Sequence, residues 1–538
     1  MAPIPAGKIF LPPAAGDGIV TALPIKRWGW MKMEVILAGH NIDHEIIKEF
    51  QSVQPERQDL TPETVAAAYA RISRNPRPVN ELRHIARGEV EKARASNRNI
   101  VFEMGHSSIA EHAVFNLDVL KVSRLLVEEI ERFRLASYTE KSQRYVLLQD
   151  DFVIPEEVRD SGMEEAFVAT VRLQNGFYHT LYERLRPWVF DRNPGLAADP
   201  ANRLLLEGWA KEDARYCLPL ATETQLGMTV NARNIELMVR RLAACALMEG
   251  HEYSRRLYDA TKGVAPSLVR YTEPTPYDRE TREALRTEAA GIISKMSAIS
   301  SGAKPGKGCD PPAAAGAGTA YDLVRLLDVT PAADEKIAAA LLHSASDLPL
   351  AESLQIAARM KREEQESLIK TALRRMKAHD AAPREFEHVG LTFELTISAT
   401  CFAQVKRHRM ATITVQEYDP ALGVTIPPSI AVIGMENAFR EICARTEETW
   451  EQIRRHSPAA AAYILTNAHR RRVMMGVSAR ELYHLARVRA DRHAQWDIRE
   501  TAERMVAQGR KVMPLTLILA AGKDGFDALY ARVFAGEN

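Results

Sequence analysis

The spacing of apolar residues along this chain predicts strands and helices in both halves. Residues 115–119 alternate apolar and polar side chains, which is typical of a strand with one buried face, and residues 391–397 do the same. Residues 33–37 form another short apolar run that we expect to be a strand. Residues 61–68 open with Thr-Pro-Glu, a helix start, and residues 122–132 space their apolar side chains as a helix does.

The same order of elements recurs in the second half. Helices are expected from Tyr321 onward, followed by the strand at residues 391–397 and a helix that ends near residue 407. The central motif recurs after 275 residues (407 minus 132), and a later helix recurs after 247 residues (480 minus 233). The two units therefore differ in loop length, and the pattern indicates one duplication rather than an array of short repeats.

The length and a change in composition predict two domains. At 538 residues the chain is too long for a single core. Residues 300–320 are rich in Gly, Pro and Ala and show no apolar periodicity, as expected of an interdomain linker. We expect domains at residues 31–299 and 321–530. They follow an N-terminal tail, residues 1–30, with the pattern of neither a signal peptide nor a membrane span.

Composition and charge narrow the class of partner. With 46% hydrophobic and 26% charged residues, the chain has the composition of an ordinary globular protein. A net charge of +1 gives no overall field that favours nucleic acid or an acidic membrane, so any anion site must be local. The cysteines lack paired spacing and are expected to be reduced thiols in a cytoplasmic protein, without a zinc site. They are Cys217, Cys245, Cys309, Cys401 and Cys443.

A polar stripe crosses an otherwise apolar helix that we expect at residues 478–506. Its members follow the spacing i, i+4, i+7, i+11 and i+15 and would share one face. They are Arg480, His484, Arg487, Asp491 and Gln495. Such a stripe is either a solvated face or the wall of a pocket. The duplicate helix carries Leu237, Ala244 and Met248 where the stripe has His484, Asp491 and Gln495. A solvated face would stay polar in both copies, so we interpret the stripe as a pocket wall.

Two cationic segments are candidates for binding anions. Residues 137–144 combine hydroxyl groups, loop amides and a guanidinium, which suit a phosphate dianion, although a polar surface turn has the same composition. Arg215 could add a second guanidinium, whereas the aligned position in the second half is Ala462. Residues 407–409, Arg-His-Arg, suit a large anionic cofactor, yet such triplets also occur on ordinary surfaces. GxGxxG, GxxxxGK[ST], GxSxG and HExxH motifs are absent, so the common nucleotide, serine-hydrolase and zinc-protease sites have no support.

Together these residues resemble the flavin-dependent thymidylate synthases. That family's signature runs Arg-His-Arg, two residues, Ser, four residues, Ser, one residue, Arg. Residues 404–409 are similar to the opening of the signature, and residues 137–145 are similar to its close. Residues 105–112 and 489–496 resemble two further family motifs, so the resemblance covers most of the chain.

The resemblance implies an α/β fold of the α+β type, with two tandem domains that each pack helices on a mixed sheet. Family sites form between subunits of a tetramer, so one nucleotide, dUMP, touches two chains. The positions expected to hold the base are Gln404, Arg407 and Arg489. The positions expected to hold the phosphate and sugar are Glu140, Ser142, Gln143, Arg144 and Arg215. Arg489 is the expected catalytic residue, because a guanidinium beside the pyrimidine stabilises negative charge on the ring.

The resemblance further implies FAD as the cofactor, with NADPH and methylenetetrahydrofolate as co-substrates and no metal. The positions expected to contact FAD are Ser108, Glu140, Asn231, Arg233, Arg407, His408, Arg409 and His484. His484 stands where the family has an asparagine. The family requires no protein nucleophile, which agrees with the lack of one in this sequence.

Each half departs from the family pattern where the other half keeps it. The first half departs at Glu129, Phe133 and Leu242, and the second at Val415, Glu417, Asp419 and Ala462. We therefore expect a fused pseudo-dimer with one working site per chain. The reciprocal site would be dead, because its acidic residues repel a phosphate. Two chains would then supply four domains as a homodimer.

The leading hypothesis is reductive methylation of dUMP to dTMP. The alternative is an FAD- and nucleotide-binding pseudoenzyme, or a synthase-derived protein that acts on another pyrimidine nucleotide. A purely structural or regulatory partner is disfavoured, because decay would then strike both copies indiscriminately.

Overall fold

The computed structural model describes residues 33–535 except for 43, 53–59, 73–74 and 303–322. The expected N-terminal tail and nearly all of the expected linker lie outside the described residues. Cys309 lies outside them as well, and the other four cysteines are free thiols. In the part of the chain that the structure describes, no helix is both long and apolar enough to cross a bilayer.

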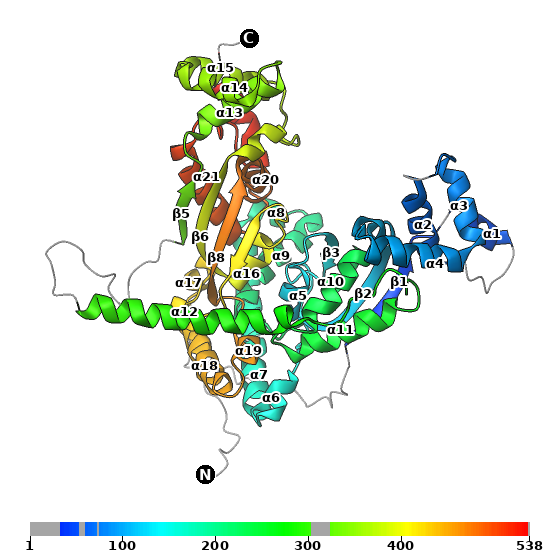
Figure 1. Ribbon diagram of the computed structural model, residues 1–538. Helices are drawn as coiled ribbons and strands as arrows, with labels where there is room; N and C mark the ends of the chain where they lie inside the picture. Colours follow the sequence, from blue (N-terminus) through cyan, green and yellow to red (C-terminus); the bar gives the residue numbers. More distant parts are fainter. Residues whose placement is uncertain (1–32, 43, 53–59, 73–74, 303–322, 536–538) are drawn as a thin grey trace.

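Each half contains one antiparallel four-stranded sheet (Figure 1). The first has the order β1-β2-β4-β3: Glu34–His40, Val114–Ser123, Glu223–Asn231 and Ala136–Glu140. The second has the order β5-β6-β8-β7: Val324–Val329, Gly390–Ser398, Arg470–Ser478 and Thr412–Val415. Because the strands are connected in the same order, the duplication read from the sequence extends to the topology. The expected α+β fold with two tandem sheets is confirmed.

Helices cover the sheets and connect their strands. Those of the first half are α1 His44–Ser52, α2 Glu63–Arg71, α3 Val79–Gly88, α4 Val90–Arg98, α5 Arg124–Ile130, α6 Glu156–Asp160, α7 Glu164–Arg192, α8 Pro194–Ala197, α9 Arg203–Ala214, α10 Ala232–Leu242, α11 Met248–Thr261 and α12 Pro276–Gly302. Those of the second half are α13 Ala333–Ser344, α14 Leu350–Arg359, α15 Arg362–Leu373, α16 Ala399–Val405, α17 Pro428–Val432, α18 Glu436–Arg454, α19 Pro458–Ala461, α20 Ala479–Arg489, α21 Trp496–Val512 and α22 Phe526–Val533.

The alternating segments form strands for the expected reason. Phe115, Leu117 and Val119 of β2 are buried in the core of the first half, while their neighbours Asn116 and Asp118 are exposed. The segment at residues 391–397 forms β6 in the same way, with its apolar side chains in the core of the second half. Each sheet therefore has one apolar face on which its own helices pack.

Several expected boundaries were wrong. Val122 belongs to β2, so the following helix, α5, begins only at Arg124. The second half opens with strand β5 rather than with helices from Tyr321. Residues 137–140 of the expected phosphate loop belong to strand β3, Ala136–Glu140. In these places pairing with a neighbouring strand, which local periodicity does not reveal, decides the structure.

The helix expected over residues 478–506 is two helices, α20 and α21, separated by a loop. Arg480, His484 and Arg487 remain on α20, but Asp491 and Gln495 lie in the loop. Gln495 caps α21, because its side chain accepts hydrogen bonds from two backbone amides at the start of that helix. The stripe is therefore not one continuous face.

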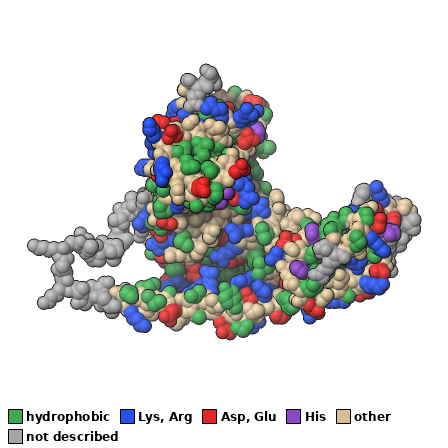
Figure 2. Space-filling model, turned by 45° about the horizontal axis from the view of Figure 1, so that its top comes forward, with side chains coloured by type: hydrophobic (Ala, Val, Ile, Leu, Met, Phe, Trp, Pro, Cys, Tyr) green, Lys and Arg blue, Asp and Glu red, His purple; other side chains and the backbone are tan. Residues whose placement is uncertain are grey.

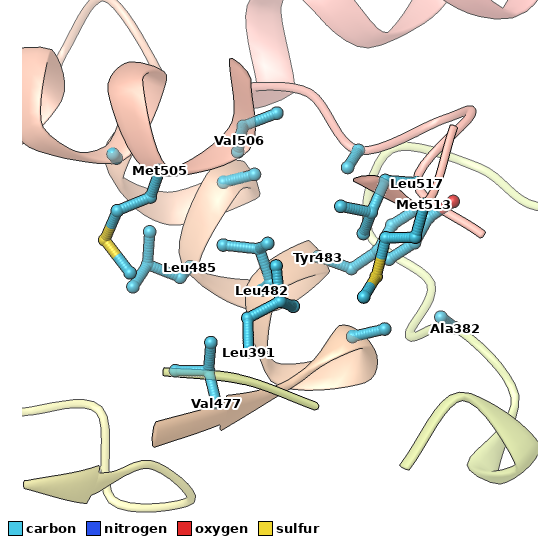
Figure 3. Packing of buried hydrophobic residues seen from close by; sticks show 14 of the residues in the cluster. Ala382, Leu391, Val477, Leu482, Tyr483, Leu485, Met505, Val506, Met513 and Leu517 are labelled. Carbon is cyan, nitrogen blue, oxygen red and sulfur yellow. The ribbon is translucent and has the colours of Figure 1, made fainter. Parts of the chain in front are cut away.

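Apolar packing fixes α20 against its neighbours. Figure 3 shows Leu482 and Leu485 of α20 among side chains of α21 and β6, including Met505 and Leu391. The direction of α20 matters for the site, because Arg489 ends this helix.

The two halves meet around an approximate two-fold axis. Leu220 N donates to Leu465 O and Asn467 N donates to Leu218 O, each at 2.8 Å. The two bonds are equivalent under the duplication. The spacing of 247 residues relates position 220 to 467 and position 218 to 465, so each half donates to the other through the same position. Such reciprocity is the property of an isologous dimer interface, here within one chain.

Two arginines repeat this reciprocity at the spacing of 275 residues. Arg134 Nη1 donates to the carbonyl oxygens of Arg409 and Ala411, at 3.4 and 3.3 Å. Arg409 Nη1 donates to those of Arg134 and Ala136, at 3.5 and 2.5 Å. Two apolar clusters also contain side chains from both halves, among them Phe177 with Phe439. The halves therefore share a continuous core.

One pair of equivalent positions carries opposite charges. Lys406 Nζ lies 2.9 Å from Glu131 Oε2, and each side chain is 6% exposed. The positions are duplicates, since 406 minus 131 is 275. Two identical halves would place like charges together here, which is unfavourable in a buried contact. The pair therefore favours pairing of unlike halves.

Charge reversal tests this contact. Glu131→Lys and Lys406→Glu should each lower the free energy of unfolding by about 3–5 kcal/mol, because each leaves buried like charges. The double reversal should recover most of that loss, as measured by chemical denaturation. Reversing the exposed Arg286–Glu417 pair is the control and should cost less than about 1 kcal/mol. If the losses of unfolding free energy in the two single variants simply add in the double variant, Glu131 and Lys406 do not stabilise the contact between the halves as a pair.

Candidate functional site

The first half contributes a strand end, a loop and a turn to the candidate site. Glu140 ends β3, and the loop that follows carries Ser142, Gln143 and Arg144. The Ser142 hydroxyl accepts a hydrogen bond from Arg144 N at 3.2 Å and so tightens this loop. Arg215 begins a 3₁₀ turn directly after α9 and is buried.

The second half contributes the ends of two helices. Gln404 lies near the end of α16, and Arg407 to Arg409 form the turn that follows it. Arg489 ends α20. On the face shown in Figure 2, Lys and Arg side chains gather in the recess beneath the upright lobe formed by the second half.

The structure brings these two sets together. Arg407 Nη2 lies 3.9 Å from Glu140 Oε2, which joins the second half to the first. Asn467 of the second half donates to Gln143 Oε1 at 3.2 Å and to Arg215 O at 2.9 Å. We call this place, where Glu140, Gln143 and Arg215 of the first half meet Arg407 and Asn467 of the second, the junction. It contains residues from both copies of the duplicated sequence.

Three buried nitrogens at this junction have no hydrogen-bond partner among the described residues: Gln143 Nε2, Arg215 Nη2 and Gln404 Nε2. A buried donor without a partner costs about 1–3 kcal/mol. Native structures leave few such groups, and a cluster of them is typical of a binding site. All three nitrogens are donors, so the missing partner is rich in acceptors.

Positive charge accumulates at the same place. Burial, and then the charges of Arg407 and Arg144, lower the pKa of Arg489 to about 10. Burial likewise lowers the pKa of Arg215, with Arg144 and Arg124 acting in the same direction and Glu212 opposing them. Neighbouring arginine charges that lower the pKa of Arg489 and Arg215 favour an anionic ligand, because it would relieve the repulsion.

Two buried carboxylates orient these arginines. Glu212 Oε2 lies 2.5 Å from Arg144 Nε. Glu140 Oε1 pairs with Arg124, and its second oxygen faces Arg407. The carboxylates offset only part of the positive charge of the five arginines at this junction, Arg124, Arg144, Arg215, Arg407 and Arg489.

The Arg-His-Arg side chains do not form one anion-binding cluster. Arg407 faces Glu140, whereas His408 is buried between Glu481 and Arg489. Arg409 crosses to the backbone of the first half. Three neighbouring residues therefore have three different surroundings.

Of the remaining expected cofactor contacts, Asn231 and Arg409 line an open pocket of about 260 Å³, together with Ser137. Ser108 and Arg233 are exposed, and Arg233 pairs with Glu111 on the surface of the first half.

Side-chain atoms of His408, Glu481 and His484 lie within 4.8 Å of one another, a donor set that could hold a metal ion. The Arg489 guanidinium beside His408 disfavours a cation there.

The reciprocal junction is filled by protein side chains. Tyr418, the duplicate of Gln143, is buried and donates to Glu128 Oε1 at 2.7 Å. Arg471 lies 2.7 Å from the other Glu128 oxygen and stacks on the Tyr418 ring. Glu417 is exposed and pairs with Arg286. We expected its charge to repel a phosphate, and the packing of Tyr418 adds a second obstacle.

Several residues at the junction were missed in the sequence. Arg124, Glu212 and Glu481 contact the expected site residues, and their duplicates are Ala399, Ala459 and Asn234. The signal that would have found them is a charge kept in only one copy, as at Arg215. Asn467 gives a weaker form of this signal, since its duplicate is Leu220 and it contacts the site through its side-chain amide.

Comparison with known proteins identifies the family. The sequence model of the family described as Thymidylate synthase complementing protein (Thy1) matches this chain twice, at residues 57–267 and at residues 325–515, once in each half. The chain belongs to the Thy1 family. A flavin-dependent thymidylate synthase from Clostridium tetani is 31% identical over 218 residues, which are 40% of this chain and 83% of the relative.

One further relative matches across both halves of the chain, and one solved structure matches less than half of it. The UPF0159 protein Ta1429 from Thermoplasma acidophilum is 25% identical over 466 residues, covering 79% of this chain and 88% of the relative. The crystal structure of thymidylate synthase X from Helicobacter pylori with FAD and dUMP is 19% identical. It covers 44% of this chain and 97% of its own, with a TM-score of 0.27.

Asp213 makes the junction of this Thy1 protein sensitive to pH. Its carboxylate accepts hydrogen bonds from Ser429 Oγ at 2.5 Å and Trp496 Nε1 at 2.9 Å, both in the second half. Burial raises the pKa of Asp213 from 3.8 to about 6, although both hydrogen bonds oppose the shift. Between these two values the unfolded chain releases a proton that the folded protein keeps.

The folded state should therefore lose stability as the pH rises from about 4 to about 6, by at most about 3 kcal/mol, and no more above that window. Asp213→Asn removes this ionisation. Relative to the variant, the wild type should become less thermostable across the window and then stay constant to about pH 8. Glu500→Gln, at an exposed pair, is the control. A difference independent of pH would refute the prediction.

Proposed function

We propose that this protein is a cytoplasmic flavin-dependent thymidylate synthase that converts dUMP to dTMP and binds neither nucleic acid nor membrane. FAD would be its cofactor, with NADPH and methylenetetrahydrofolate as co-substrates. The observation that carries the proposal is the set of unpartnered buried donors on Gln143, Arg215 and Gln404, beside Arg144 and Arg489. A nucleotide monophosphate supplies both a dianion and a ring with acceptor oxygens.

Each part of dUMP would meet a different set of residues. Arg144 and Arg215, with Ser142 and Gln143, would hold the phosphate, since guanidinium groups form paired hydrogen bonds with its oxygens. Glu140 would lie toward the sugar. Gln404 and Arg407 would hold the pyrimidine. Arg489 would lie at the imide, where its charge lowers the pKa of N3–H and stabilises negative charge on the ring.

The residues expected to hold FAD fit a large polar cofactor. Asn231 and Arg409 line an open pocket formed by both halves, and His484 is exposed near His408. Glu140 and Arg407 would contact the flavin from the nucleotide side, whereas the buried His408 side chain would act through its neighbours. When bound and reduced by NADPH, FAD supplies the hydride of the reductive methylation.

Ser108 and Arg233 are exposed on the first half, where Arg233 pairs with Glu111. We propose that a second chain completes the FAD site there. The assembly would then be a homodimer of chains, equivalent to four Thy1 domains.

A second candidate function is supported by one departure from the family pattern and one contact. His484 stands where the family has an asparagine, and Arg409 donates to backbone carbonyls of the first half. A pseudoenzyme that binds FAD and a nucleotide, or an enzyme for another pyrimidine nucleotide, would tolerate both features.

A thymidine-requiring bacterial strain tests the proposal. Genes for the wild type and for Asp419→Ala should restore growth without thymidine, whereas Arg144→Ala should not. Arg144→Ala should weaken dUMP binding by about 2–3 kcal/mol in calorimetric titration, because a charge-assisted contact is lost. Asp419, its duplicate, only caps a short turn. Equal loss in both variants would contradict a single site, and no growth despite dUMP binding would favour the pseudoenzyme.

Stoichiometry gives an independent prediction. If each site needs Arg144 and Arg215 from one half and Gln404 and Arg489 from the other, a chain provides one site. Saturating titration should give one dUMP per chain, and flavin absorbance should give one FAD per chain. The reciprocal junction is closed by Tyr418 and should bind neither. Two equivalent nucleotides per chain would be incompatible with this arrangement.

A further inference from the structure

Three side chains of the second half form a hydrogen-bonded chain that ends at Arg489. Glu481 Oε1 lies 3.0 Å from His408 Nδ1, and Arg489 Nε donates to His408 Nε2 at 3.1 Å. Arginine can only donate, so Nε2 must accept, and the proton of the neutral imidazole must reside on Nδ1. His408 therefore donates to Glu481 while it accepts from Arg489.

The first two members of the chain are held rigidly. Glu481 lies in the first turn of α20, where its N–H donates to Ser478 Oγ at 3.2 Å and where the helix end favours a carboxylate. The His408 side chain is 2% exposed. Burial lowers the pKa of His408, the bond to Glu481 opposes this shift, and the charges of Arg489 and His484 add to it. The ring is therefore neutral near pH 7.

The first half has lost all three members together. At the duplicate positions it has Asn234 for Glu481, Phe133 for His408 and Leu242 for Arg489. Leu242 is buried and Phe133 packs against the core of the first half. The fold therefore does not need this chain of hydrogen bonds, and its members are kept only in the half that also keeps Gln404 and Arg407.

We propose that Glu481 and His408 are positioning residues that hold the Arg489 guanidinium toward the bound nucleotide. This inference rests on the proposed function, because it takes the pyrimidine of dUMP as the group that Arg489 faces. The interposed imidazole matters chemically. A carboxylate bonded directly to Arg489 would cancel much of its charge, whereas a neutral ring orients the guanidinium and leaves its charge for the ligand.

Without this anchor Arg489 would be free to turn away. It is partly buried, and the positive charges of Arg407 and Arg144 repel it. Among the described residues, its other hydrogen bond is a long one, from Nη2 to Gln404 O at 3.4 Å. Loss of His408 or Glu481 should therefore displace the guanidinium while the phosphate contacts stay intact.

Steady-state kinetics of the FAD-loaded protein test the role. Glu481→Ala and His408→Phe should lower kcat by about 10- to 100-fold, because a displaced catalytic group costs this much. The dUMP affinity should change far less. Glu481→Gln should retain part of the activity, since its carbonyl still accepts from Nδ1–H. The first half shows that the fold accepts phenylalanine at the His408 position, and Glu500→Gln is the exposed control.

A second measurement does not depend on turnover. Nitrogen-15 spectra of the ligand-free wild type should show His408 as the neutral Nδ1–H tautomer. The His408 signals are assigned as those that the spectrum of His408→Phe lacks. The Nε2–H tautomer or an imidazolium at pH 7 would overturn the inference. Unchanged kcat in Glu481→Ala, or equal losses of kcat, dUMP affinity and thermostability, would also overturn it. A wild type that binds no dUMP would instead overturn the proposed function, and the role of Arg489 with it.

Discussion

Glu131 and Lys406 meet at 2.9 Å with almost no water around them, at positions that the duplication made equivalent. A homodimer of identical subunits cannot place opposite charges at such positions, because each residue faces its own copy. Fusion of two copies removes that restriction. Once the halves could differ, each could bring the charge that the other lacks. The candidate site depends on this pairing, since neither half contains a complete set of its residues.

The same asymmetry explains the chemistry of the junction. Burial and the charges of neighbouring arginines lower the pKa of Arg489 and Arg215, and two buried carboxylates from the first half offset only part of the positive charge. A protein that needed only a stable core would pair each buried charge here, because unpaired buried charge is costly. The opposite junction has such pairing: Glu128 accepts a hydrogen bond from Tyr418 and forms an ion pair with Arg471.

The loss of residues in groups is more informative than any single loss. Glu481, His408 and Arg489 touch in sequence, and none of them survives in the first half. Residues that act as a unit lose their value together once one is gone. Arg215 and Glu212, replaced by Ala462 and Ala459 in the second half, follow the same rule. In a duplicated chain the two copies therefore report which contacts serve the fold and which serve the site.

The sequence by itself determined the duplication, the alternating strands and the family, because strand periodicity and motif spacing are local properties. It also predicted which residues of each half belong to the site, although their roles stay predictions. Only the tertiary structure decided that the helix at residues 478–506 breaks before Gln495, since Gln495 is drawn into a contact with Tyr216 of the other half. It alone separated Arg407, His408 and Arg409 into three environments, because a turn points neighbouring side chains in different directions. Contacts between residues about 275 positions apart have no local pattern, and they arise only when two cores pack together.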